Sequence, residues 1–171
     1  MTISVFTPIH KVDAERIRRL YENLSTQTRP PDEWVVLLNG EAKDMPFQHH
    51  PWIKVHRTEI TGNIGALKHE CCRLATGDVL VEVDYDDALV PTALERIESA
   101  FADNGVQVVY SNCVEIDDNG ESRTYSAIYG WKQRLARIDV RDHIQMVAFP
   151  PQAQYMRRIE WASNHVRAFW A

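Results

Sequence analysis

The sequence predicts an α/β domain with a mostly parallel central sheet, and three observations support that fold class. Apolar, strand-like segments alternate with segments of helical period through roughly the first hundred residues, and parallel strands need such helical crossovers. The chain has 171 residues, of which 44% are hydrophobic, so one domain with a real core is expected. Three carboxylates follow the apolar segment 79–83, and α/β sheets bind ligands at the carboxyl ends of their strands.

The first strand and the first helix open the chain. Residues 3–7 predict a buried strand that stops at Pro8, which cannot donate a hydrogen bond to a sheet. Asp13 can cap a helix that runs to about Leu24. The apolar residues of this helix recur at helical spacing: Ile17, Leu20, Tyr21 and Leu24.

Two more strands are expected after a break at residues 29–32, where two prolines stand together. Residues 34–38 predict the second strand, which ends at the turn signal Asn39-Gly40. Residues 41–52 are polar and contain proline, which favours a loop, and residues 53–55 predict a short third strand.

The second helix and the fourth strand follow. Gly62 and Gly65 lead into a helix that is expected to run to about Thr76, with Gly77 beyond its end. Its inward residues are Leu67, Cys71 and Leu74. Residues 79–83 are the fourth strand.

The last elements are less regular. Pro91 suits the first turn of a third helix, which ends near Gly105. Its apolar face is Leu94, Ile97 and Phe101. Residues 106–110 predict another strand, and Asp118-Asn119-Gly120 predicts a hairpin between residues 114–116 and 122–125. Residues 130–154 show no clear pattern. Residues 155–170 predict a helix from the spacing of Ile159, Ala162, Val166 and Phe169.

Charge and composition exclude several classes of function. The net charge is −5 without a basic block, which argues against nucleic-acid binding as the main activity. No apolar run reaches the length of a membrane span, and no secretory signal opens the chain. Of the three cysteines, Cys71 and Cys72 are adjacent and poorly placed to pair with each other. A reduced, cytoplasmic setting is therefore expected.

The carboxylates Asp84, Asp86 and Asp87 are the strongest chemical signal. Side chains alternate along a strand, so Asp84 and Asp86 are expected to point the same way. Hard cations such as Mn²⁺ or Mg²⁺ take one or two carboxylates and share their other positions with water and phosphate. Asp86 and Asp87 are the expected direct ligands, with Asp84 reaching the metal through water or binding a ribose hydroxyl. The competing interpretation is a solvated loop with Asp87 as the N-cap of the next helix.

Three other segments are expected near the same edge of the sheet, each with an ordinary structural alternative. Thr7-Pro8 could contact a nucleoside or simply end a strand. Asn39 could bind a base edge or start a turn. Gly65 and Lys68 could approach a phosphate, or could serve helix entry with Lys68 in solvent.

Taken together and in order, these segments resemble the family 2 glycosyltransferases, which have the GT-A fold. The resemblance covers about residues 1–125. It rests on residues 3–8, 34–40, 62–68, 74–78 with 83–87, 110–112 and 116–120. It implies a Rossmann-like, three-layer α/β/α sandwich with a small β-hairpin after the strand that carries the DxD motif. It also implies a single domain over 1–171, with a donor half at 1–110 and a partial acceptor half at 111–171.

The resemblance implies a site for a nucleotide-diphosphate sugar, with a UDP-sugar favoured. Thr7, Pro8 and Asn39 would contact the nucleoside. Gly65 and Lys68 would lie near the ribose or diphosphate. The DxD segment would bind ribose, sugar and metal through Asp84, Tyr85, Asp86 and Asp87. Family members invert the sugar and need a general base for the acceptor hydroxyl, which could belong to a glycan, a lipid or a protein.

The chain departs from the family pattern at two places. The family usually has Asp where this chain has Asn39, which leaves the base preference open. After Asp142 the only carboxylate side chain is Glu160, and the acidic pair that supplies the base is not found. The expectation is a truncated or naturally minimal chain that lacks the general base.

Two alternatives follow from these features. A non-catalytic nucleotide-sugar-binding protein would keep the fold without the base. A nucleotidyltransferase would need a Gly-, Arg- and Lys-rich loop after the first strand. Residues 7–11 offer one Lys and no Gly, so this alternative ranks low.

Overall fold

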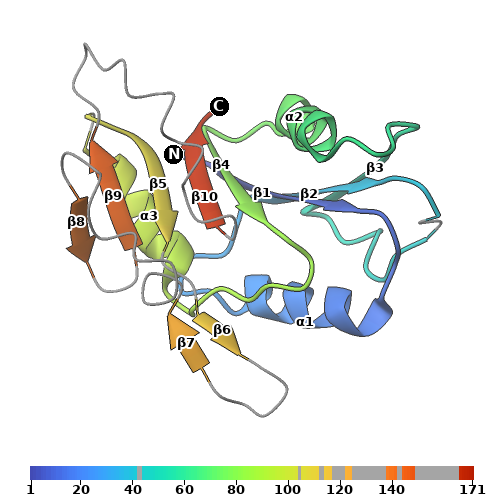
Figure 1. Ribbon diagram of the computed structural model, residues 1–171, viewed down its shortest axis with the longest axis horizontal. Helices are drawn as coiled ribbons and strands as arrows, with labels where there is room; N and C mark the ends of the chain where they lie inside the picture. The colour runs from blue at the N-terminus through green and yellow to red at the C-terminus, as the bar shows by residue number, and fades with distance from the viewer. Residues whose placement is uncertain are drawn as a thin grey trace.

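The computed structural model describes residues 1–41, 44–103, 105–111, 114–116, 122–124, 138–141, 144–148 and 166–171 (Figure 1). The helices are α1 (Ala14–Ser25), α2 (Ile64–Leu74) and α3 (Ala93–Phe101). The strands of the main sheet are β1 (Ile3–Ile9), β2 (Glu33–Leu38), β3 (Ile53–Arg57), β4 (Val79–Val83), β5 (Val106–Ser111), β8 (Ile138–Arg141), β9 (Ile144–Ala148) and β10 (Val166–Trp170). None of the helices in these ranges is long and apolar enough to cross a membrane.

The main sheet has the order β3-β2-β1-β4-β10-β5-β9-β8 among the described residues. β1 pairs in parallel with β2 and β4, and β2 pairs in parallel with β3. β10 runs antiparallel to both β4 and β5, and β9 runs antiparallel to β5 and β8. Six of the eight strands therefore share one direction, and the mostly parallel sheet that the sequence predicts is confirmed.

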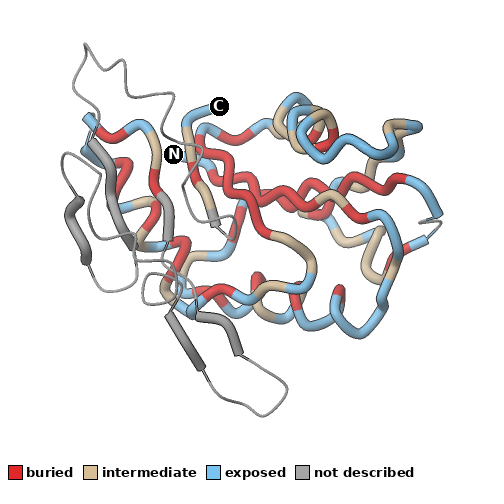
Figure 2. Tube along the Cα trace, in the orientation of Figure 1, coloured by how far each residue is buried: buried red, intermediate tan, exposed pale blue. Residues whose placement is uncertain are grey.

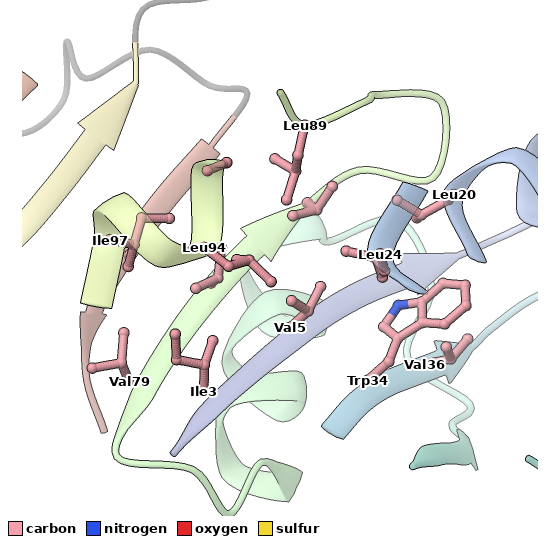
Figure 3. Packing of buried hydrophobic residues seen from close by; sticks show 14 of the residues in the cluster. Ile3, Val5, Leu20, Leu24, Trp34, Val36, Val79, Leu89, Leu94 and Ile97 are labelled. Carbon is pink, nitrogen blue, oxygen red and sulfur yellow. The ribbon is translucent and has the colours of Figure 1, made fainter. Parts of the chain in front are cut away.

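Helices cover both faces of this sheet and complete three layers (Figure 1). Val5, Val36 and Val79 face α1 and α3, in the same cluster as Leu20 and Leu94 (Figure 3). Adjacent residues of the same strands face α2: Phe6, Val35 and Leu80 pack with Leu67 and Cys71. This alternation is the period of a strand buried on both sides. Figure 2 shows the resulting buried centre between helices whose outer faces are exposed.

Helix ends follow the predicted signals closely but not in every detail. Asp13 accepts hydrogen bonds from the backbone N–H groups of Glu15 and Arg16, both at 3.1 Å. α2 ends at Leu74, two residues earlier than expected, because Ala75 already has extended backbone. Pro91 precedes α3, and Thr92 is its N-cap, so Asp87 is not the cap of this helix.

The amino-terminal edge of the sheet is internally satisfied. The buried Glu33 carboxylate accepts from the Ser4 hydroxyl and the Thr76 N–H, each at 2.5 Å. The Gly77 N–H donates to Ser4 Oγ at 2.7 Å. A Cβ at position 77 would lie 2.5 Å from that oxygen, which explains the glycine after α2. These polar groups join β1, β2 and the end of α2.

The predicted C-terminal helix is wrong where the structure describes it. Residues 166–170 form β10, while residues 155–165 lie outside the described ranges. Phe169 packs edge-to-face with Phe6 on the α2 side, and Trp170 packs in the same way with Phe101 on the α3 side. Consecutive side chains thus point to opposite faces, as in a strand. β4 and β5 run in the same direction with a gap between them, and a reversed strand supplies both with hydrogen-bond partners.

The predicted hairpin is present. β6 (Val114–Ile116) and β7 (Ser122–Thr124) form a separate antiparallel pair in which Val114 lies opposite Thr124. The turn residues 117–121 and Tyr125 lie outside the described ranges.

Candidate functional site

The carboxyl ends of three neighbouring strands meet at one edge of the sheet. β1 lies between β2 and β4, and all three run in parallel. This topology places Thr7-Pro8, Asn39 and the segment 84–87 next to one another. Lys68 reaches the end of β4 from α2. The edge that the sequence predicts as the ligand site is therefore the one that gathers these residues.

The Thr7 hydroxyl, expected to contact a nucleoside, instead makes hydrogen bonds inside the protein. It is fully buried, its hydroxyl donates to the Val83 carbonyl at 2.7 Å, and it accepts from Trp34 Nε1 at 3.0 Å. The hydroxyl proton is therefore committed to joining β1 and β4. The prediction that the first strand stops at Pro8 is wrong, because β1 continues to Ile9 with Pro8 opposite Leu37. A ligand could meet the partly exposed ring of Pro8.

Asn39 carries a buried oxygen that lacks a partner. Its residue is 3% exposed, its backbone N–H donates to the Ile9 carbonyl at 3.0 Å, and its Nδ2 donates to the Ile60 carbonyl at 3.3 Å. Among buried side-chain atoms of the described residues, Asn39 Oδ1 and His50 Nδ1 have no hydrogen-bond partner. Leaving a buried acceptor without a hydrogen bond costs about 1–3 kcal/mol of stability. A donor from a ligand at this edge would remove that penalty.

The carboxylates after β4 lie in a turn rather than along the strand. β4 ends at Val83, and the Asp87 N–H donates to the Asp84 carbonyl at 3.1 Å. Asp84 lies 3.5 Å from Lys68 of α2, whereas Asp86 lies 3.2 Å from Arg16 of α1. The prediction that Asp84 and Asp86 point the same way is therefore wrong, because the turn ends the alternation of the strand. In Figure 1 the segment after β4 leaves the sheet toward α1.

Asp84 lies beside a partly buried network of charged side chains. Glu82 is 3% exposed, and its Oε1 lies 2.5 Å from Lys68 Nζ. Its Oε2 lies 3.9 Å from Arg167 of β10. Glu82 is not among the residues that the sequence predicts for this site. The available signal is a charged residue inside an apolar strand, two positions before Asp84 and so on the same face.

Burial and the neighbouring charges together shift the pKa of Asp84. Burial raises the pKa of this carboxyl above its ordinary value. The Lys68 ammonium acts in the opposite direction, while the nearby charge of Glu82 raises the pKa further. Asp84 is thus a carboxylate whose negative charge is only partly compensated, beside the one ammonium it shares with Glu82.

Asp86 and Tyr85 contact the first helix. The side chains of Asp86 and Arg16 are each about half exposed, at 50% and 49%. The Arg16 guanidinium carbon lies 5.9 Å from the centre of the Tyr85 ring, within cation–π range. Tyr85 also packs on the core cluster beneath α1 and α3.

The glycines of the α2 entry do not share one role. Gly62 has φ +68°, which favours glycine. Gly65 is exposed, and a Cβ there would meet only Asn63 Oδ1 at an ordinary 3.5 Å. Asn63 caps α2 by accepting from the Ala66 N–H at 3.0 Å. Nothing in the backbone therefore requires glycine at position 65.

The donor set at this edge suits a hard divalent cation that shares its coordination with a substrate. No group of three or more His, Cys, Asp or Glu side chains in the described ranges could hold a metal by itself. Asp86 is exposed and Asp87 is partly exposed on the turn. Mn²⁺ or Mg²⁺ bound through one or two carboxylates, water and phosphate oxygens needs no more protein ligands than these.

Comparison with known families supports the resemblance. A model described as Glycosyl transferase family 2 matches residues 4–162. The chain belongs to this family. No relative among curated proteins matches it.

Solved structures also match this family 2 chain. The crystal structure of S. aureus TarS 1-349 is 21% identical with a TM-score of 0.51, and the match covers 63% of this chain and 34% of that one. Mannosyltransferase PcManGT from Pyrobaculum calidifontis, in complex with GDP-Man and Mn2+, is 19% identical with a TM-score of 0.49, covering 68% and 36%. The likeness to TarS shows the GT-A fold. The chain spans about a third of the length of these structures.

Proposed function

We propose that this domain binds a nucleotide-diphosphate sugar through Mn²⁺ or Mg²⁺ and serves inverting transfer of the sugar to an acceptor hydroxyl. The observation that carries the proposal is the position of the carboxylate turn at residues 84–87. The turn follows β4 and lies beside the carboxyl ends of β1 and β2, in a chain that belongs to family 2.

Each residue of the edge has a proposed role that its contacts support. Asp86 and Asp87 hold the metal, which when bound supplies Lewis-acid stabilisation of the diphosphate leaving group. Asp84 accepts from a ribose hydroxyl or a metal-bound water. Lys68, held by Glu82 at 2.5 Å, directs its ammonium toward the phosphates. Tyr85 and the exposed Gly65 border the donor on either side of this turn.

The side chain of Asn39 supports a base that presents an N–H. Its Nδ2 donates one proton to the Ile60 carbonyl, whereas the buried Oδ1, a pure acceptor, has no partner. Uracil, thymine and guanine each present a ring N–H at the edge that pairs with other bases. Adenine presents an amino N–H there as well, but its ring position is an acceptor, which Oδ1 cannot match. We therefore propose a UDP-sugar first, with dTDP- and GDP-sugars as the other candidates.

Calorimetric titration of UDP, GDP, dTDP and ADP, with and without Mn²⁺, tests this proposal. One of the first three nucleotides is expected to bind with metal and to lose most of its affinity without it. ADP is expected to bind weakly in both conditions. Equal binding of all four nucleotides, or binding that ignores the metal, would contradict the proposed donor site.

The substitution Asp86→Ala tests the metal ligand. It is expected to abolish the metal-dependent part of nucleotide binding with unchanged circular dichroism, because Asp86 is half exposed and outside the core. Glu22→Gln is the matched control, since Glu22 is an exposed carboxylate that pairs with Arg18 on the same helix. Unchanged nucleotide affinity in Asp86→Ala would remove Asp86 from the metal site.

A non-catalytic nucleotide-sugar-binding protein is the second candidate. It is motivated by residues 143–171, in which Glu160 is the only carboxylate side chain. Incubation with the matching nucleotide sugar separates the two candidates. Metal-dependent release of nucleotide, by hydrolysis or transfer to an added acceptor, supports the enzyme, and tight binding without release supports the binding protein.

A further inference from the structure

Arg16 lies against the carboxylate turn without an assigned role. It stands in the first turn of α1, and its Nη1 lies 3.2 Å from Asp86 Oδ2. Its Nε lies 3.6 Å from Asp13, and its guanidinium carbon lies 5.9 Å from the Tyr85 ring centre. Asp13 and Tyr85 thus help to hold the Arg16 guanidinium beside Asp86, the proposed metal ligand. The neighbouring Arg18 and Arg19 contact glutamates on the surface of α1 instead.

A guanidinium on Asp86 opposes a bare metal ion at the same carboxylate. Both cations seek the same oxygens, and a divalent ion placed there would also repel the Arg16 charge. A bound diphosphate changes this balance, because it brings negative oxygens that can accept both the metal and the guanidinium. Arginine suits that second partner, since its planar fork matches the geometry of phosphate oxygens.

We propose that Arg16 is a diphosphate-binding residue that leaves Asp86 for the phosphates of the donor when metal and donor bind together. Arg16 neutralises Asp86 before binding, and Asp13 and Tyr85 keep its guanidinium at the turn during the exchange. The inference rests on the proposed function and extends it. Metal alone should bind weakly, and diphosphate should bind far better than nucleoside.

The test uses Arg16→Gln in the full chain with two binding measurements. Mn²⁺ alone is titrated and followed by the electron paramagnetic resonance signal of the free ion. The best nucleotide of the UDP, GDP and dTDP panel is then titrated with Mn²⁺ present, beside its nucleoside. Arg16→Gln is expected to bind Mn²⁺ about two- to fivefold more tightly, the range for loss of an exposed ion pair. It is expected to bind the nucleoside diphosphate roughly tenfold more weakly, as for a lost charge-assisted hydrogen bond, and the nucleoside equally well.

Arg19→Gln is the matched control, because Arg19 is on the same helix and pairs with Glu15 of that helix. Arg16→Lys keeps the charge without the fork and should lie between the wild type and Arg16→Gln in diphosphate affinity. If Arg16→Gln behaves as Arg19→Gln in both titrations, Arg16 is a surface ion pair only and the inference fails while the proposed function stands. If the wild-type chain binds no nucleoside diphosphate with metal, the proposed function fails and the inference fails with it.

Discussion

Glu82 places a carboxylate inside the sheet, where an ionised group is tolerated only when it is paired. Lys68 reaches it from α2 and Arg167 reaches it from β10. The pairing makes Glu82 the point at which charged residues of three elements meet: α2, β4, which precedes the segment 84–87, and β10, which pairs with β4. Its proposed function is to position Lys68 rather than to touch the donor.

Replacing Glu82 by Gln should therefore reduce both stability and donor affinity. The side chain of Lys68 is 22% exposed and can find water, so the expected loss is about 1–3 kcal/mol rather than the larger figure for a fully buried pair. Urea unfolding measures this loss, and Glu22→Gln should change the free energy of unfolding by less than about 0.5 kcal/mol.

The positioning role of Glu82 has its own measurement. Nucleotide affinity with Mn²⁺ should fall in Glu82→Gln, and Lys68→Met should give the same fall without a further one in the double variant. Additive losses of affinity would mean that Glu82 and Lys68 act separately and that Glu82 is structural only.

Individual site residues differ in how far the sequence could predict them. The type and order of the edge residues could be predicted, because Asn39 and the carboxylates follow apolar strands directly in the chain. The directions of their side chains could not be predicted, because they depend on the turn from Asp84 to Asp87, which begins where β4 ends. Arg16 had no local signal at all, since it is one of three arginines on the surface of α1.

Among the elements, the start of β1 is tied to β2 by a side chain. Asp32 Oδ2 accepts from the Ile3 N–H at 2.7 Å and lies 2.8 Å from Arg29 Nη1. Burial by itself would raise the pKa of Asp32, but the Ile3 hydrogen bond and the Arg29 ion pair outweigh it, and the pKa is lowered. A carboxyl with a lowered pKa in the folded state adds stability that is present above its unfolded pKa and lost as the pH falls through the folded one.

The substitution Asp32→Asn should therefore be costly at neutral pH and nearly neutral in acid. At pH 7 the expected loss is about 1 kcal/mol, since the side chain is 46% exposed and solvent screens the ion pair. The difference in the free energy of unfolding between wild type and variant should shrink as the pH falls below 3.8, the ordinary pKa of aspartate. Urea unfolding at a series of pH values measures this difference. A difference that is constant across the series would assign the loss to packing rather than to charge.

Elements also differ in how well a local pattern identifies them. α1 could be predicted with its cap because Asp13 and the apolar stripe lie within one segment. β10 could not, because Val166 and Phe169 have helical spacing and the deciding partners, β4 and β5, are more than fifty residues away in the chain. Tertiary pairing overrides local period when a strand can satisfy two sheet edges at once.

For the whole molecule, the position of β10 means that residues 166–170 form a strand inside the sheet. It separates β3, β2, β1 and β4, which carry the candidate site, from β5, β9 and β8. Arg167 of the same strand also lies 3.9 Å from Glu82, next to the candidate site. The two parts of the sheet, and the charge network of the site, therefore depend on one segment near the C-terminus.

A charge placed in β10 should consequently unfold the domain rather than loosen its end. Ala168 is fully buried in the apolar cluster that includes Val81 and Val109, its neighbours on β4 and β5, so Ala168→Asp would place an unpaired carboxylate in the core. Such a buried charge costs on the order of 4 kcal/mol or more, which approaches the whole stability of a typical domain. Ala102→Asp is the control, because Ala102 is exposed at the end of α3. Ala168→Asp is expected to lose the cooperative thermal transition that Ala102→Asp retains. If Ala168→Asp instead melted cooperatively and bound nucleotide as the wild type does, β10 would not be an integral strand of the sheet.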